Sequence, residues 1–220
     1  MSTSAELSET ELASLLCSRL CHDLLSPIGA MNNGLELLAD ETDPEMRARC
    51  IELLTDSARA SANKLKFFRL AFGAAGGFGD KVDVNEPRAL IEGLVADKPR
   101  VELQWHVPND LLAKPAVKVL LNLALIGLDG LVRGGELVIG AEENGGSCEI
   151  AVSATGPKVV IDDAVAAALS GGMGAGISAG TMSPRTAPAY MIDRIARRHG
   201  GEIQIAHSAE SLVIGAMLRV

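Results

Sequence analysis

The chain has 220 residues, of which 48% are apolar and 22% charged, and its formal net charge is −8. This length suits one or two domains, and the apolar content is ample for packed cores. The acidic balance argues against nucleic-acid binding, which needs basic surface. Residues 119–128 form the longest strongly apolar stretch, too short to span a bilayer, and residues 1–6 do not resemble a signal peptide. We therefore expect a cytoplasmic protein that does not enter the membrane.

Apolar residues at intervals of three and four predict an amphipathic helix over residues 9–39. The apolar stripe consists of Leu12, Leu16, Leu20, Leu24, Ile28, Met31, Leu35 and Leu38. His22 lies on the other side of this helix, roughly 170° from the centre of the apolar stripe. Residues three, four and seven positions apart share a helix face, so Ser18, Ser26 and Gly29 surround the imidazole with small groups. We expect His22 to be exposed, with room beside it for a large partner.

Two neighbours of His22 favour a nucleophilic role. Asp23 can accept a hydrogen bond from one ring nitrogen, which fixes the tautomer and leaves the other nitrogen free to attack. Pro27 has no amide to donate, so the carbonyl of Asp23 loses its usual helical partner and the helix can bend there.

The four cysteines, Cys17, Cys21, Cys50 and Cys148, show no paired spacing. In a reducing compartment we expect them to be small buried hydrophobic residues. A metal site built from Cys17, Cys21 and His22 is disfavoured, because His22 points about 100° away from Cys21 around the helix and no fourth ligand lies near.

A second helix should begin at Pro44, capped by Asp43, and end before Gly73. Its apolar stripe consists of Met46, Cys50, Leu53, Leu54, Ala58, Leu65, Phe68 and Phe72. Both helices thus carry a long apolar stripe, and two such stripes cannot be buried against one another alone. A four-helix bundle made by two chains solves this problem, so we expect a homodimer with one His22 on each flank.

The rest of the chain mixes helices and strands, which predicts an α/β sandwich over residues 77–220, after a helical domain at residues 1–76. The fold class is thus α+β. The expected elements are a helix at 85–96, a strand at 101–107, a helix at 114–132, a hairpin of 136–141 and 148–152, a short alanine-rich helix, a helix at 185–198, and a hairpin of 202–206 and 211–220.

The run His22-Asp23-Leu24-Leu25-Ser26-Pro27-Ile28 resembles the histidine box of two-component sensor kinases, in which an acid follows the histidine and a proline comes five residues later. Leu25 replaces the usual basic residue, which implies a more apolar docking surface. Ser26 replaces the Thr or Asn associated with phosphatase assistance.

Residues 192–203 are similar to the last helix and Gly-Gly turn of the histidine-kinase ATP-binding domain, the Bergerat fold. Asn122 matches the first asparagine of that domain's asparagine box, but Ile126 replaces the second, which binds magnesium. Ala154 stands where an aspartate reads adenine, and residues 182–190 hold two prolines and no phosphate-cradling glycines. The resemblance therefore implies a degenerate ATPase domain that does not bind ATP.

A kinase-like scaffold with an intact histidine and a degenerate nucleotide pocket resembles the ChpT-type histidine phosphotransferases of alphaproteobacterial cell-cycle signalling. The resemblance implies that His22, assisted by Asp23, relays a phosphoryl group between receiver domains. The donor would be a CckA-like hybrid histidine kinase, and the acceptors CtrA-like and CpdR-like response regulators. It implies no cofactor or metal of its own, since the partner receiver supplies magnesium. The expected docking residues are Ser18, Arg19, Leu25, Ser26, Gly29 and Asn32.

Two other hypotheses remain open on the sequence. The chain could be a histidine kinase that uses ATP in an unusual pocket, or a dimerisation scaffold whose histidine is incidental. Autophosphorylation with ATP would indicate the kinase. Failure to accept phosphate from a receiver would indicate the scaffold.

Overall fold

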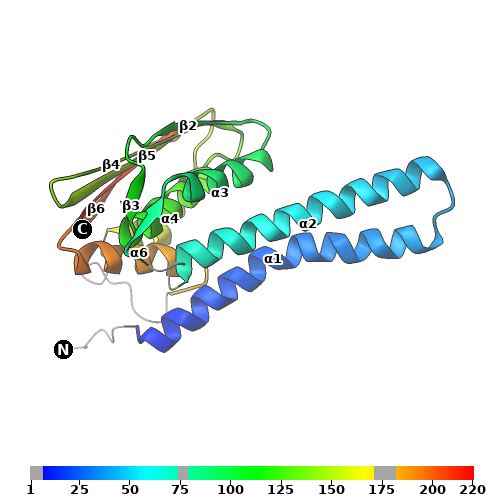
Figure 1. Cartoon of the computed structure of the whole chain (residues 1–220), viewed down its shortest axis with the longest axis horizontal. Helices are drawn as coiled ribbons and strands as arrows, with labels where there is room; N and C mark the ends of the chain where they lie inside the picture. Colours follow the sequence, from blue (N-terminus) through cyan, green and yellow to red (C-terminus); the bar gives the residue numbers. More distant parts are fainter. Residues whose placement is uncertain (1–6, 74–78, 171–181) are drawn as a thin grey trace.

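The structure is a computed structural model that describes residues 7–73, 79–170 and 182–220. Its N-terminal part is an antiparallel hairpin of two long helices, α1 (Glu9–Asp40) and α2 (Pro44–Phe72). The far end of the hairpin extends well beyond the rest of the molecule, and its base rests on an α/β part (Figure 1). The predicted bounds of both helices are confirmed within one residue.

Local capping explains where the two helices begin. The Ser8 side chain accepts from the backbone N–H of Glu11, and the Glu11 carboxylate accepts from Ser8 in return. These bonds hold the pKa of the Glu11 carboxyl below its usual value, the Ser8 hydroxyl having the larger effect and the Ser8 backbone N–H the smaller. At α2, Asp43 Oδ1 accepts from two backbone N–H groups at 2.9 Å, and Pro44 takes the first helical position.

The second part contains four helices and seven strands within the described residues. They are β1 (Lys81–Asp83), α3 (Asn85–Ala96), β2 (Val101–His106), β3 (Leu111–Ala113), α4 (Lys114–Gly130), β4 (Gly135–Asn144), β5 (Ser147–Thr155), α5 (Asp163–Leu169), α6 (Ala187–Arg198), β6 (Glu202–His207) and β7 (Ser211–Arg219). No helix in the described part of either half is long and apolar enough to cross a membrane.

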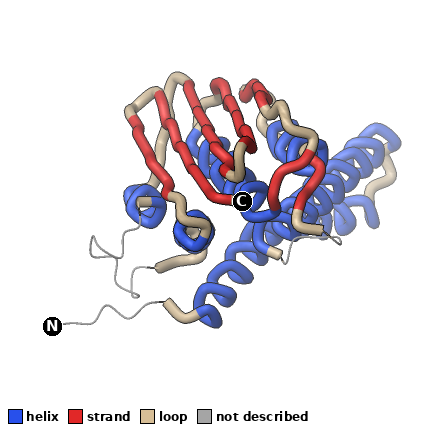
Figure 2. Tube along the Cα trace, turned by 60° about the vertical axis from the view of Figure 1, so that its left-hand side comes forward, coloured by secondary structure: helices blue, strands red, loops and turns tan. Residues whose placement is uncertain are grey.

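Five of these strands form the main sheet, in the order β2-β4-β5-β7-β6. Only the β2–β4 pair is parallel, and the β4–β5 hairpin turns at Gly145 and Gly146, whose φ angles of 59° and 81° suit glycine. Buried and more exposed residues alternate along β5 and β7, because one sheet face is covered by helices (Figure 2). The predicted class, a helical hairpin followed by an α/β sandwich, is confirmed.

One hydrophobic core runs through both parts of the chain. Phe67 and Leu70 near the end of α2 are 1% and 2% exposed, and they belong to the same cluster as Leu120 of α4 and Leu137 of β4. The predicted domain boundary between residues 76 and 77 lies outside the described residues. Because α2 packs into this shared core, the base of the hairpin is held against the α/β part.

Several expectations about the α/β part need correction. The helix expected from residue 185 begins at Ala187, and β4 and β5 extend beyond the expected strands at 136–141 and 148–152. The helix expected to reach Val132 ends at Gly130, since Leu131 leaves the helix to form a β-bridge with Val159. The short strands β1 and β3, which pair with each other, were not predicted.

The expectation of four buried cysteines is half wrong. Cys50 and Cys148 are buried, whereas Cys17 and Cys21 are exposed on α1. Burial, aided by the charges of Glu143 and Glu149, raises the pKa of the Cys148 thiol to about 11. Cys148 therefore stays a protonated, inert core residue at neutral pH.

Candidate functional site

His22 stands out from the surface of α1, with 82% of its side chain exposed. Its Nδ1 lies 3.1 Å from Asp23 Oδ1. A carboxylate accepts hydrogen bonds, so this contact assigns the ring proton of a neutral imidazole to Nδ1 and leaves the lone pair of Nε2 free. The predicted exposure of His22 and its contact with Asp23 are both confirmed.

Asp23 is held in turn by Arg19, one helical turn earlier. Arg19 Nε lies 2.7 Å from Asp23 Oδ2, and Arg19 Nη2 lies 3.4 Å from Asp129 Oδ2 at the end of α4. Lys98 Nζ approaches the other Asp129 oxygen at 3.6 Å. The Arg19 side chain is only 18% exposed and is shared by two carboxylates, so it links α1 to the α/β part. Its role in docking stays a prediction.

The carbonyl that Pro27 leaves without an amide has a different partner. Lys64 Nζ, from α2, donates to the backbone oxygen of Asp23 at 3.1 Å. The sequence predicted that this carbonyl would be open, but it gave no sign of Lys64, which lies 41 positions away. Asp23 is thus held through its carboxylate by Arg19 and through its carbonyl by Lys64.

The other predicted docking residues follow the side of α1 that carries His22. Leu25 is 68% exposed, which is unusual for a leucine, and Gly29 is half-buried. The polar members, all exposed, are Ser18, Ser26 and Asn32. Around the histidine the structure therefore presents small groups and one large apolar side chain.

Two glycines of α1 differ in what surrounds them. A Cβ built on Gly34 would lie 3.1 Å from Leu54 Cδ2, so the packing of α1 on α2 favours glycine there. A Cβ on Gly29 would meet nothing within 4 Å among the described residues. Glycine inside a helix costs about 0.5–1 kcal/mol relative to alanine. Nothing in this part of the chain offsets that cost at Gly29, and a docking protein could do so.

We expect Gly29→Ala to raise the free energy of unfolding by about 0.5–1 kcal/mol, because it adds helix propensity without a clash. Gly29→Gln, which has a bulkier side chain, should also fold, but it should raise the dissociation constant for a receiver about tenfold. Denaturant unfolding and titration with a receiver measure the two effects. Gly34→Ala is the matched control. Because its Cβ would press on Leu54, we expect it to stabilise the chain less than Gly29→Ala does, or to destabilise it. Unchanged receiver affinity in Gly29→Gln would contradict the assignment of this surface.

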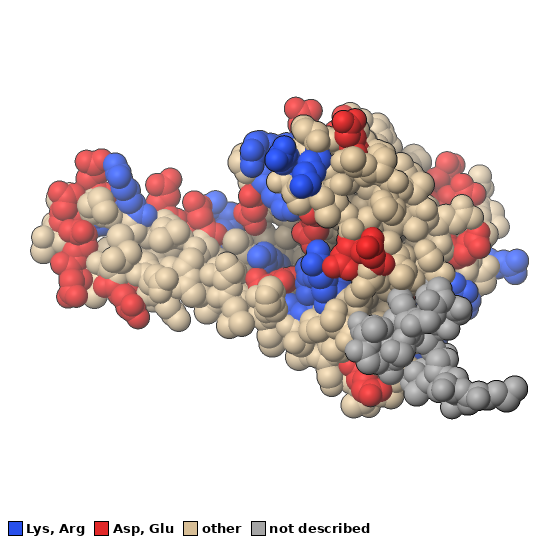
Figure 3. Space-filling view, turned by 180° about the vertical axis from the view of Figure 1, so that it is seen from behind, with Lys and Arg blue, Asp and Glu red and all other residues tan. Residues whose placement is uncertain are grey.

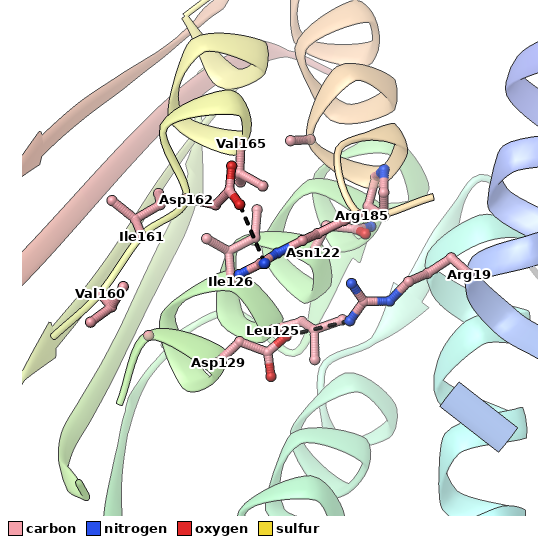
Figure 4. A pocket seen from close by; sticks show the side chains of 13 residues that line it. Arg19, Asn122, Leu125, Ile126, Asp129, Val160, Ile161, Asp162, Val165 and Arg185 are labelled. Atoms are coloured by element: carbon pink, nitrogen blue, oxygen red, sulfur yellow. Dashed lines mark hydrogen bonds and ion pairs between the residues drawn. The ribbon is translucent and has the colours of Figure 1, made fainter. Parts of the chain in front are cut away.

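The α/β part has a small cavity at the place expected for a nucleotide (Figure 4). Asn122 and Ile126 of α4 line it, together with Asp162 and Arg185, whose ion pair of 3.3 Å spans one side. The cavity volume is about 70 Å³, whereas ligand pockets usually measure roughly 300–1,000 Å³. Ala154 is fully buried in β5, so no carboxylate stands there to read adenine. These residues do not fit a nucleotide with its magnesium ion.

Asn122 is 1% exposed, and its Nδ2 donates to the Lys118 carbonyl at 2.8 Å. Its Oδ1 has no hydrogen-bond partner within the described part of the chain. Burial lowers the pKa of Lys118, with a further contribution from the charge of Lys114.

Within residues 7–73, 79–170 and 182–220, no three His, Cys, Asp or Glu side chains lie close enough together to hold a metal ion.

Comparison with known proteins identifies the family to which this chain belongs. Residues 84–211 match the family of the histidine phosphotransferase C-terminal domain. That match covers more than half of the chain, which therefore belongs to the histidine phosphotransferase family.

Two relatives support the assignment. The protein phosphotransferase ChpT of Brucella abortus (strain 2308) is 43% identical over 143 residues, which are 64% of this chain and 66% of that protein's length. A solved structure of a bacterial phosphotransferase has a TM-score of 0.83 and 32% identity, covering 98% of this chain and 100% of that one. The predicted resemblance to ChpT-type proteins is confirmed.

Proposed function

We propose that the chain is a phosphoryl carrier that relays a phosphoryl group through His22 between receiver domains. The observation that carries this proposal is the exposed imidazole, 82% accessible, with Nδ1 held 3.1 Å from Asp23 Oδ1 and Nε2 unobstructed. Membership of the histidine phosphotransferase family supports it.

The reaction is an in-line displacement at phosphorus. The lone pair of His22 Nε2 attacks the phosphoryl group of a receiver phosphoaspartate, which is a mixed anhydride. The new N–P bond forms as the P–O bond to the receiver carboxylate breaks, and that carboxylate leaves. Positive charge develops on the imidazole ring, and the Asp23 carboxylate stabilises it through Nδ1–H. The receiver supplies magnesium, so the chain contributes position and orientation.

The partners that we propose are those implied by the ChpT-type resemblance: a CckA-like hybrid kinase as donor, and CtrA-like and CpdR-like response regulators as acceptors. A cytoplasmic location and a role in cell-cycle control belong to the same proposal. Figure 3 shows that acidic side chains gather around the tip of the helical hairpin, whereas much of its visible side carries few charged side chains.

We also propose that two chains form the four-helix bundle. Members of the predicted apolar stripes remain exposed in the single chain: Ile28 is 40% exposed, Leu35 56%, Leu53 43% and Leu65 49%. Pairing with a second copy would cover a face that α1 and α2 do not cover for each other.

A two-armed labelling experiment tests the carrier against the ATP-using kinase. We expect no incorporation from radiolabelled ATP with magnesium, because the 70 Å³ cavity and the residues around it do not fit a nucleotide. We expect rapid incorporation from a hybrid-kinase receiver charged with labelled phosphate. Autophosphorylation with ATP would contradict the carrier function and indicate a kinase. A chain that stays unlabelled in both arms would favour a scaffold.

A further inference from the structure

We infer that Lys64 is a positioning residue for phosphoryl transfer. It donates a hydrogen bond to the backbone carbonyl of Asp23, which has no amide partner at Pro27 and lies next to His22. This inference rests on the proposed carrier function of His22. Lys64 would act through Asp23 and make no contact with the transferred group.

The argument begins with the helix backbone. In an α-helix the carbonyl of residue 23 accepts from the amide of residue 27, and a proline at 27 has no such amide. The missing bond falls at Asp23, whose side chain orients the His22 ring at 3.1 Å. A backbone carbonyl without its partner would loosen the helix at the residue on which the tautomer of His22 depends.

Lys64 supplies the missing donor from the neighbouring helix. Its Nζ lies 3.1 Å from the Asp23 oxygen, and the bond is partly buried. A bond from a charged donor is stronger than the amide bond that it replaces. Lys64 forms no ion pair with an acidic side chain in the described part of the chain, and its ammonium donates to the Asp23 carbonyl instead.

The chain offers a matched control on the same helix. Lys66 is exposed, two positions further along α2, and the described residues give it no partner. Lys66→Met changes the net charge as Lys64→Met does, without removing a hydrogen bond. Lys64→Arg keeps a cationic donor that can reach the carbonyl.

The first measurement is single-turnover transfer from a phosphorylated hybrid-kinase receiver to the 220-residue chain. We expect Lys64→Met to lower the maximal transfer rate about tenfold, while the half-saturating receiver concentration stays within twofold of wild type. Lys64→Arg should recover the rate to within about threefold, and Lys66→Met should match wild type. A wild-type rate in Lys64→Met would overturn the inference.

A double-mutant cycle with Pro27 makes the test specific. Pro27→Ala restores an amide that can donate to the Asp23 carbonyl, so Lys64 becomes redundant there. When Pro27→Ala is already present, we expect Lys64→Met to change the rate by less than twofold. An equal loss with and without Pro27→Ala would overturn the inference, because Lys64 would then act through its charge alone. If Lys64→Met does not fold, the same cycle is measured as the free energy of unfolding. We then expect Pro27→Ala to restore the stability of Lys64→Met. A double variant that is no more stable than Lys64→Met would contradict the inference.

Failure of this inference can be told apart from failure of the proposed function. A wild-type chain that never accepts the label defeats the carrier function itself. A wild-type chain that accepts it normally, while Lys64→Met does so at the same rate, defeats only the role of Lys64. Nitrogen-15 NMR of the His22 ring adds an independent readout, since loosening Asp23 should lower the fraction of the Nδ1–H tautomer.

Discussion

Replacement of His22 by glutamine is expected to abolish phosphoryl acceptance, with a fall of at least about 1,000-fold in the transfer rate, as for the removal of other enzymatic nucleophiles. Glutamine keeps a polar side chain of similar length, but its amide nitrogen has no available lone pair to attack phosphorus. Because His22 is 82% exposed, its loss removes no core packing, and the fold should remain intact. The measurement is labelling by a phosphorylated receiver, read after gel separation at neutral or alkaline pH.

The other histidines provide the controls for this experiment. His106 and His207 are exposed, and His199 Nδ1 lies 2.9 Å from the carbonyl of Arg219. Glutamine at any of these three positions should leave acceptance within twofold of wild type. Undiminished labelling of His22→Gln would show that the phosphoryl group resides elsewhere.

The second large effect concerns assembly. We expect the double variant Leu35→Glu, Leu53→Glu to be monomeric at micromolar concentration, with the dissociation constant of the dimer raised by about 1,000-fold or more. Burial of one leucine contributes about 1.5–3 kcal/mol, and each substitution occurs twice in a symmetric dimer. Since these side chains are 56% and 43% exposed in the single chain, the variant should keep its secondary structure. Sedimentation velocity across a concentration series measures the result.

Leu25→Glu is the matched control for assembly. Leu25 is 68% exposed like the residues of the proposed interface, but it lies off the apolar stripe and near His22. This variant should remain a dimer and lose affinity for receivers. A dimeric Leu35→Glu, Leu53→Glu chain would rule out the proposed bundle, and a monomeric Leu25→Glu chain would move the interface to the histidine side.

The elements that were predicted well are those set by local chemistry. Asp43 and Pro44 fix the start of α2 through capping, and Gly73 marks its end. The hairpin of β4 and β5 follows from alternating residues around Gly145 and Gly146. In each case the decisive groups lie within a few residues of one another, so one stretch of sequence contains the whole cause.

The features that were missed depend on contacts between distant segments. Strands β1 and β3 have three residues each, too few for an alternation pattern, and they exist because they pair with each other. Asp129 lies 110 positions from Arg19, and Lys64 lies 41 positions from Asp23. Pro27 revealed that a carbonyl was open, but only the packing of α1 on α2 identifies its donor.

The central claim is that phosphate is carried on one exposed ring nitrogen of His22. The most direct measurement is mass-spectrometric mapping of the wild-type chain after incubation with a phosphorylated receiver, with proteolysis kept above neutral pH to preserve acid-labile phosphohistidine. We predict a single phosphorylated residue, His22. Phosphate on any other side chain, or a chain that remains unmodified while the receiver keeps its label, would contradict this account.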